Sequence, residues 1–260
     1  MSTLELCGVG VRYGPVEALA PFDGVVRSGE WLGLIGPNGA GKSSLLRAVV
    51  GLVAASGEVL VNGEPLASHT HRRRAQLVAY VPQDPLMPDD MNGFEYVLLG
   101  RTPYISYFAS ATRHDRTIVG EVLERLDLAH LGRRRLGALS GGERQRMVIG
   151  RALAQQAPIL LLDEPTAALD IGHQQQALEL VARLRAEHGL TVVSAMHDLT
   201  LAGLYSDRLA LLHEGQLVAS GPAMDVLRAD TLREFYGVSV SVHHEPDGTV
   251  VVIPRRVAAR

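Results

Sequence analysis

The chain has 260 residues, enough to bury one substantial core, or one core and a small appendage. Its composition, 47% hydrophobic and 20% charged, is ordinary for a globular protein. The net charge of -3 gives no broad electrostatic reason for binding to nucleic acid or to an acidic membrane.

The amino-terminal stretch "MSTLELCGVG" lacks the charged and apolar regions of a signal peptide. No apolar run approaches the roughly 20 residues that span a bilayer, so we expect work at a membrane only through a partner. Cys7 is the only cysteine, which excludes an internal disulfide and favours a cytosolic location. Two basic runs, at 71–74 and 133–135, are interpreted as solvated surface.

The first predicted elements are strands that lead into a glycine-rich loop and a helix. Residues 4–35 alternate apolar and polar side chains with glycine and proline breaks, which indicates short antiparallel strands. Residues 31–36 form an apolar run that ends in glycine, and residues 42–52 have helical spacing that stops at Gly51. Strand, glycine loop and helix in this order are the context of a phosphate-binding loop.

Later apolar runs predict a parallel sheet. Residues 77–83 are strand-like, and residues 158–165 and 190–198 are continuously apolar, as is typical of parallel strands covered on both faces. Strands that alternate with helical segments give a parallel α/β sheet. Residues 207–221 predict a hairpin that turns at Glu214–Gly215.

Two segments do not follow this alternation. From Asp84 to about Arg151 the pattern is mainly helical, which predicts a helical subdomain inserted into the sheet domain. The last thirty or so residues, from 231, predict a hairpin turning at Pro246–Gly248, and a small edge hairpin is favoured over a regulatory element. The helical segment holds five aromatic residues that form either its core or an exposed docking patch: Phe94, Tyr96, Tyr104, Tyr107 and Phe108.

The stretch "GPNGAGKSS" fits the pattern G-x-x-x-x-G-K-S. Glycines let successive backbone N–H groups converge on phosphate oxygens, and the following helix adds its positive dipole end. The Lys42 ammonium can reach the β and γ phosphates, and the Ser43 hydroxyl can ligate Mg²⁺. The predicted nucleotide-binding loop consists of Gly36, Pro37, Asn38, Gly39, Ala40, Gly41, Lys42, Ser43 and Ser44.

Two carboxylates follow at the end of the strand "ILLLDE", where open parallel sheets bind ligands. Asp163 is suited to hold Mg²⁺ through water, and Glu164 is placed to polarise an attacking water. Because adjacent desolvated carboxylates do not readily both ionise, we expect different surroundings for the two. Gln83 could ligate the metal or the water, whereas a lone histidine such as His197 at a strand end is more often a core residue.

Taken together, these motifs resemble the ATP-binding cassette family. The resemblance runs from about residue 4 to 237 and has "GPNGAGKSS", Gln83, "LSGGERQR", "LLLDEP", "AALD" and "MHD" in family order and spacing. It implies an α/β P-loop NTPase fold, with a RecA-like sheet core (1–83 and 155–230), an antiparallel β subdomain and an inserted α-helical subdomain (84–154). The ATPase domain would span 1–240, and 241–260 would form a carboxyl-terminal hairpin or tail.

The resemblance also implies that ATP, with Mg²⁺, is held between two copies arranged head to tail. Tyr13 would stack on adenine, Asp170 would contact the opposite copy and His197 would sense the γ-phosphate. Glu164 would be the catalytic base, assisted by Gln83, and the metal would be held by Ser43, Gln83 and Asp163.

The same resemblance implies a function for the stretch "LSGGERQR", residues 139–146. Ser140, Gly141 and Gly142 precede an amphipathic helix, so they offer a hydroxyl and free backbone donors at its amino terminus. The resemblance implies that these donors bind the phosphate held by the neighbouring subunit. Glu143 stands where many family members have glutamine, and we expect little loss of function from it.

Three stretches, "LGRTPYISYF", "LSGGERQR" and "LDIGHQ", resemble ATPase subunits of importers for iron-siderophores, haem and vitamin B12, ranked in that order. This implies an ATPase coupled to transport at the cytoplasmic face of the membrane. The implied partners are a second copy, integral membrane permease subunits and, indirectly, a substrate-binding protein, with no nucleic acid. The aromatic stretch at 94–108 is the candidate contact with the permease.

Two other classes of protein remain open at this point. One is a soluble ATP-binding cassette protein that acts on ribosomes or DNA, which usually carries two cassettes, coiled coils or basic arms that this chain lacks. The other is a small-molecule phosphotransferase, which also uses a phosphate-binding loop but has no need of residues 139–146 and acts as a monomer.

Overall fold

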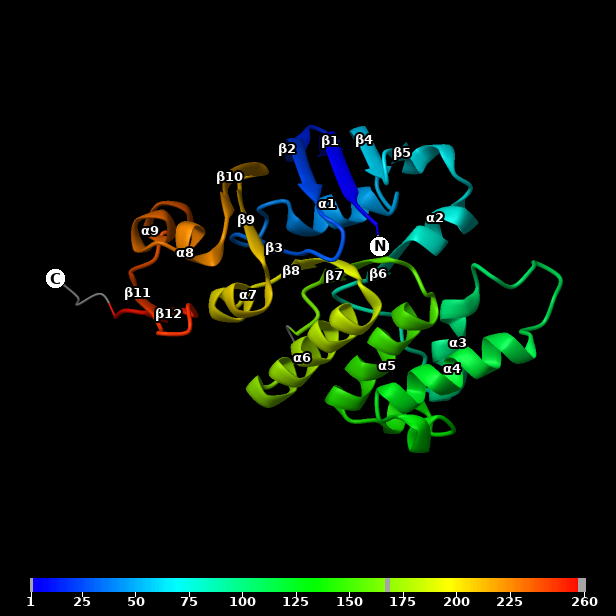
Figure 1. Cartoon of the computed structure of the whole chain (residues 1–260). Coiled ribbons are helices and arrows are strands. Elements are labelled where there is room, and N and C mark those ends of the chain that lie inside the picture. Colours follow the sequence, from blue (N-terminus) through cyan, green and yellow to red (C-terminus); the bar gives the residue numbers. More distant parts are fainter. Residues whose placement is uncertain (1, 167–168, 257–260) are drawn as a thin grey trace.

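The structure of the chain, a computed structural model, describes residues 2–166 and 169–256 (Figure 1). Of the "AALD" motif, Ala167 and Ala168 lie outside the described residues. None of the helices within the two described ranges is both long enough and apolar enough to cross a membrane.

The main sheet has six strands in the order β10-β9-β3-β8-β7-β6. Neighbours from β9 to β6 pair in parallel, and β10 pairs with β9 antiparallel in the expected hairpin. Parallel pairing brings the carboxyl ends of β3, β8, β7 and β6 to one edge of the sheet. The bounds are β3 Trp31–Ile35, β6 Val78–Val81, β7 Ile159–Asp163, β8 Thr191–Ala195, β9 Arg208–His213 and β10 Gln216–Gly221.

Both faces of the main sheet are covered. In β7, Leu160 and Leu162 belong to one buried cluster, whereas Ile159 and Leu161 belong to the other. Successive side chains of a strand point to opposite faces, so a strand buried on both sides needs an unbroken apolar run. This confirms the parallel, doubly covered strands expected from residues 158–165 and 190–198.

A second, antiparallel sheet has the order β2-β1-β4-β5 and lies above α1 in Figure 1. Its strands are longer than the short ones expected, and β1 accommodates its glycine breaks as shifts of register against β2. Leu45 and Leu46 of α1 are buried in the cluster that joins the two sheets. The bounds are β1 Leu4–Tyr13, β2 Val16–Val26, β4 Ala55–Val61, β5 Glu64–Pro65 and α1 Lys42–Val49.

The remaining helices lie mostly on the other side of the main sheet or at its end. Helices α3, α4 and α5 form a group at one end of the molecule, and α6 and α7 lie under the sheet in Figure 1. The α-helices are α2 His71–Leu77, α3 Gly93–Leu98, α4 Arg113–Arg125, α5 Gly141–Ala154, α6 Ile171–His188, α7 Leu199–Tyr205, α8 Ala223–Val226 and α9 Ala229–Tyr236. Short 3-10 turns span Leu66–Ser68, Leu99–Arg101, Ala129–Leu131 and Leu136–Ala138.

The five aromatic residues of the helical segment divide between the two roles considered for them. Tyr96 is fully buried, and Phe94 packs against the same core. Tyr104 is half-buried and its hydroxyl donates to the Gln155 carbonyl at 2.9 Å. Tyr107 and Phe108 are 93% and 98% exposed. The aromatic stretch is therefore part core and part exposed tip.

The carboxyl-terminal hairpin is present, but it does not extend an edge of the main sheet. Strands β11 (Val240–His244) and β12 (Val250–Pro254) form a two-stranded sheet of their own. The Val252 N–H donates to the Thr200 hydroxyl of α7 at 3.1 Å. Two buried valines, Val240 and Val250, join the main core, which explains why the hairpin packs on α7.

Candidate nucleotide site

A cavity of about 380 Å³ opens at the edge of the main sheet where the parallel strands end. Sites in open parallel sheets lie at this edge because loops leave the carboxyl ends of the strands there. The lining residues are Ala18, Asn38, Gly39, Ala40, Gly41, Lys42, Ser43, Ser44, Gln83, Glu164 and His197. The structure thus brings most of the predicted loop together with Gln83, Glu164 and His197.

The glycines of the loop are required by its shape. Gly36 and Gly41 have φ values of 147° and 100°, which side chains rarely adopt. A Cβ at Gly36 would lie 2.1 Å from the Leu212 carbonyl oxygen, and one at Gly41 would lie 2.7 Å from that of Ala18. Gly41 also caps α1 without a side-chain hydrogen bond, so the first N–H groups of α1 remain available to an anion.

Lys42 is only 4% exposed and is held by the loop itself. Its ammonium donates to the carbonyl oxygens of Gly36 at 2.7 Å and Pro37 at 3.0 Å. Burial lowers the pKa of Lys42, and the nearby charges of Glu164 and Asp163 oppose that shift. The amine therefore sits at the floor of the cavity beside both carboxylates.

Asp163 ends β7 fully buried, with one partner for each oxygen. Oδ1 accepts a 2.7 Å hydrogen bond from the Ser43 hydroxyl, and Oδ2 accepts one of 2.9 Å from the Tyr80 hydroxyl. Burial raises the pKa of Tyr80 to about 12, so its hydroxyl stays protonated and donates. The pair of Ser43 and Asp163 provides the oxygen ligands that Mg²⁺ prefers.

Glu164 follows directly but turns toward the cavity. Its φ of 50° lies in the left-handed region, and its N–H donates to the Ala195 carbonyl at 3.1 Å. This unusual backbone conformation bends the chain at the end of β7. Oε2 accepts a 2.6 Å hydrogen bond from Gln83 Nε2, and Oε1 lies 2.5 Å from His197 Nε2.

The two adjacent carboxylates have separate partners, as the sequence analysis expects. Asp163 is held by hydroxyl donors from α1 and β6, and Glu164 by groups that follow β6 and β8. These hydrogen bonds offset the cost of burying two acids side by side.

Besides Gly36, Pro37 and Asp163, which lie close to lining residues in the sequence, five other predicted residues do not line the cavity. Tyr13 ends β1 and is 45% exposed, and Asp170 caps α6 by accepting from the His173 N–H at 2.9 Å. Ser140, Gly141 and Gly142 begin α5 and also do not line the cavity. The structure therefore separates the predicted site into two groups within one chain.

The backbone donors at Ser140 are not all free, which corrects an expectation. The Ser140 N–H donates to a Glu143 carboxylate oxygen at 2.7 Å, and the Glu143 N–H donates to the Ser140 hydroxyl oxygen at 3.3 Å. This capping box forms because serine at the cap and glutamate three residues later satisfy each other. The same hydrogen bond lowers the pKa of Glu143, which keeps a negative charge beside the predicted anion site.

Sequence reasoning missed two contributors to the site. Tyr80 donates a hydrogen bond to Asp163. The sequence signal that could have found Tyr80 is its position three residues before Gln83, in the strand that pairs with β7. Ala18 lines the cavity from the antiparallel sheet, and nothing in the local sequence distinguishes it. Both depend on how strands from distant segments pair.

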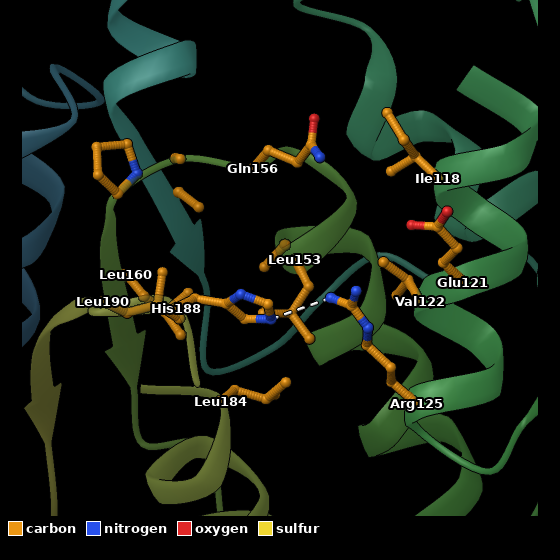
Figure 2. Close-up of a pocket in the computed structure, with 14 residues that line it drawn as sticks. Ile118, Glu121, Val122, Arg125, Leu153, Gln156, Leu160, Leu184, His188 and Leu190 are labelled. Carbon is orange, nitrogen blue, oxygen red and sulfur yellow. Dashed lines mark hydrogen bonds between the residues drawn. The ribbon is translucent and has the colours of Figure 1, made fainter. Parts of the chain in front are cut away.

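A second cavity, of about 360 Å³, lies between α4, α5, α6 and the amino ends of β7 and β8, and contains none of the predicted site residues. Figure 2 shows Arg125 of α4 pointing at His188 of α6, and their side-chain nitrogens are 3.0 Å apart. Most of its other lining residues are apolar, including Ile118, Leu160 and Leu184. This cavity lies where the helical group meets the sheet.

Comparison with known proteins gives a family and several relatives. Residues 19–167 match the ABC transporter family. The chain is 42% identical over 251 residues to a hemin import ATP-binding protein of Streptomyces coelicolor, covering 96% of this chain and 89% of the relative. It is 39% identical over 254 residues to a cobalamin import ATP-binding protein of Halobacterium salinarum, covering 97% of this chain and 63% of that relative, which is less than two thirds of its length.

Two solved structures are similar over most of their length. A chain of a metal-chelate type ABC transporter in an inward-facing conformation superposes with a TM-score of 0.85 at 26% identity, covering 98% of each chain. A dimeric ATP-binding cassette in a post-hydrolysis state, bound to ADP and phosphate, gives a TM-score of 0.73 at 27% identity, covering 85% of this chain and 98% of that one.

Proposed function

The chain belongs to the ABC transporter family, and we propose that it is the ATP-hydrolysing subunit of an importer for a metal chelate. The expected α/β P-loop NTPase fold is confirmed by the cassettes that superpose on it. The observation that carries the proposal is the meeting of the loop lysine, the strand-end acids and their partners at one edge of the sheet.

For the imported substrate we propose haem first and a cobalamin second. This order follows the relatives, which are named for hemin and cobalamin import and cover nearly all of this chain. The iron-siderophore ranked first by the sequence resemblance is supported only by the coarser likeness to a metal-chelate type transporter. The cavity of this chain holds groups for a nucleotide, so the imported molecule would be bound by other subunits.

The loop is proposed to hold the triphosphate of ATP. Backbone N–H groups between Gly36 and Ser44 and the amino terminus of α1 would donate to phosphate oxygens. Lys42 would transfer its ammonium hydrogen bonds from the carbonyls of Gly36 and Pro37 to the phosphates. We propose that exposed Tyr13 stacks on the adenine ring.

The donor set beside the loop fits Mg²⁺, because Ser43, Asp163 and Gln83 offer only neutral or anionic oxygen ligands. When bound, Mg²⁺ would neutralise charge on the β and γ phosphates. Ser43 would ligate it directly, and Asp163 would hold the Ser43 hydroxyl and the metal's water in place.

Glu164 is the proposed base for hydrolysis. Its carboxylate reaches the cavity, and it would accept a proton from the attacking water. Gln83 and His197 each contact one carboxylate oxygen of Glu164, and these contacts fix the direction in which the carboxylate points. His197, at the end of β8, would also donate to the γ-phosphate.

We propose that the complete site forms between two copies arranged head to tail. Ser140, Gly141 and Gly142 lie outside the cavity of their own chain, and a dimeric cassette superposes on this fold. Donors at the start of α5 would then complete the phosphate site of the partner copy, and Asp170 would contact the partner. Closure on ATP and reopening after hydrolysis would drive permease subunits at the cytoplasmic face of the membrane.

The same proposal divides the chain into parts that move. Residues 1–83 and 155–230 would form the core that holds ATP, and 84–154 the helical part that carries Ser140 to the partner. Residues 241–260 would be an appendage on α7. A substrate-binding protein would act through the permease and not through this chain.

A complementation experiment tests the shared site. Lys42→Ala disables the loop of a chain, and Ser140→Arg blocks the start of α5 in a chain whose loop is intact. Each variant alone should lack ATPase activity, whereas a mixture should recover it, because one of the two sites in the mixed dimer joins an intact loop to an intact α5. Phosphate release is measured as a function of protein concentration. As the control, each variant alone is assayed at twice its concentration in the mixture, so that the total protein is equal.

Recovery of about half the wild-type rate per mixed dimer supports the shared site. No recovery in the mixture, with both variants folded and dimer formation intact, contradicts it. A wild-type rate strictly proportional to protein concentration would instead favour a phosphotransferase that acts as a monomer.

A further inference from the structure

The loop between Arg101 and α4 carries an exposed pair of aromatic rings, Tyr107 and Phe108, called here the aromatic tip. The two side chains are 93% and 98% exposed, and their rings pack edge to face with centroids 5.1 Å apart. Figure 1 shows this loop extending away from the body of the molecule beside α2 and α4. Large aromatic side chains so fully exposed are usually contact groups.

The base of this loop is firmly attached. The Arg101 guanidinium lies 3.8 Å from the centre of the Tyr104 ring, and the Tyr104 hydroxyl donates to Gln155. The Pro103 carbonyl accepts hydrogen bonds from Arg72 at 2.5 Å and Gln76 at 3.0 Å, which ties the loop to α2. The tip is therefore presented at a fixed place between α2 and the start of α4.

The segments around the tip are positive, although the whole chain has a net charge of -3. No aspartate or glutamate occurs from Pro65 to Gln83 or from Tyr96 to His114. Four exposed arginines lie in or beside these segments. Arg113 and Arg116 follow the tip in the sequence, and Arg72 and Arg73 lie in α2, which the Pro103 carbonyl joins to the loop. The charge around the tip therefore differs in sign from the net charge of the chain.

Two of these arginines stand where they weaken their own helix. Arg113 and Arg116 lie in the first turn of α4, where the positive end of the helix dipole disfavours cations. Asp115, the acid of that turn, is buried in a pair with Arg101 and so does not screen them at the surface. Their position is explained if they face an anionic partner.

We propose that the aromatic tip inserts into the interface of a bilayer that contains anionic lipids, with the flanking arginines on lipid phosphates. The bilayer interface places an apolar boundary directly beside a layer of negative charge, and aromatic side chains concentrate there. Basic residues near such a surface add attraction that salt screens. This contact needs neither ATP nor a second copy, so it goes beyond the proposed function.

The full chain is mixed with sedimenting vesicles of phosphatidylcholine, or of phosphatidylcholine with phosphatidylglycerol. Wild type should bind the anionic vesicles about tenfold more strongly than the neutral ones, and less at high salt. Tyr107→Ser with Phe108→Ser should lower binding to anionic vesicles about tenfold. Leu52→Ser, a matched control at a side chain 64% exposed elsewhere, should bind like wild type.

Equal binding to both vesicle types, or unchanged binding of the tip variant, overturns the proposal. So does binding that requires permease in the vesicles and is then lost in the tip variant, because the tip would contact the permease instead. ATP hydrolysis by the tip variant in solution should equal that of wild type. If wild type itself hydrolyses no ATP, the proposed function is contradicted. The vesicle measurements would still decide the lipid proposal, because they do not depend on hydrolysis.

Discussion

Gln83 and Glu164 are 81 positions apart in the sequence, yet Gln83 Nε2 donates a 2.6 Å hydrogen bond to Glu164 Oε2. Gln83 begins the segment that leads into the helical group, and Glu164 ends the strand β7 beside it. A displacement of the helical group would therefore pull directly on the carboxylate proposed as the base. This hydrogen bond would link the proposed permease-driven motion to the proposed hydrolysis.

Replacing the Glu164 carboxylate should stop hydrolysis after ATP has bound. In Glu164→Gln the amide cannot take a proton from water, so phosphate release should fall at least about 100-fold. ATP binding should remain, and ATP should hold the variant as a dimer in size-exclusion chromatography. Glu187→Gln, at an exposed position of α6, is the control with the same charge change. Hydrolysis near the wild-type rate would show that another group is the base.

Lys42 is the only lysine of the chain, so its amine can be followed by chemical labelling. Burial lowers its pKa from the ordinary 10.5, so the neutral, reactive amine should form at a lower pH than in an ordinary lysine. Acetylation measured by mass spectrometry should show its midpoint below that pH, and ATP should slow it. The amino-terminal amine is the internal reference. A midpoint at or above 10.5, or no protection by ATP, would contradict the placement of Lys42.

Glu143 should restrain the proposed contact between copies. Its charged carboxylate binds the Ser140 N–H and adds a negative charge where a partner's phosphate would approach. Glu143→Gln should tighten the ATP-dependent dimer about three- to tenfold, because the repulsion is removed. The weaker cap should lower the free energy of unfolding by about 0.5 kcal/mol. Dimerisation is measured by analytical ultracentrifugation in the Glu164→Gln background, where a looser dimer would be the contrary result.

The pair of Arg101 and Asp115 should be a main support of the helical group. Asp115 accepts from Arg101 Nε at 3.0 Å and from the Thr112 hydroxyl at 2.6 Å, and both ionic side chains are buried. Asp115→Ala leaves the Arg101 charge without its partner, so the free energy of unfolding should fall by about 3 kcal/mol. Chemical denaturation measures this loss, and Glu121→Ala at an exposed position of α4 is the control.

The same pair predicts a pH dependence. The Thr112 hydrogen bond, with help from Arg101, holds the pKa of Asp115 below its ordinary 3.8. A carboxyl whose pKa is lower in the folded state stabilises the fold above its unfolded pKa and loses that effect as pH falls through the folded value. The difference in unfolding free energy between wild type and Asp115→Ala should therefore be constant above about pH 5 and shrink below about pH 4. A difference that grows on acidification would contradict this assignment.

Much of the site could be predicted from the sequence because its parts are local. The loop at 36–44 needs glycines at fixed places and a helix directly after it, and both requirements are visible in consecutive residues. The acids at 163–164 follow an apolar strand, so their position at a sheet edge could be inferred as well. The hairpin at Glu214–Gly215 is likewise specified by its own turn residues.

Other features depend on contacts between distant segments. Tyr80 reaches Asp163 only because β6 pairs with β7, and Ala18 reaches the cavity only because the antiparallel sheet lies over α1. The carboxyl-terminal hairpin could be predicted, but its position on α7 could not. Apolar and polar residues alternate in the same way in a hairpin at a sheet edge and in one packed on a helix.

The sequence alone thus determined which groups this protein has for handling a phosphate, because those groups are set by residue type and short spacing. Tertiary structure alone decided which of them share one cavity, which lie apart at the start of α5, and which aromatic rings stay exposed. Those outcomes follow from strand pairing and burial, in which a side chain's surroundings come from segments far away in the chain.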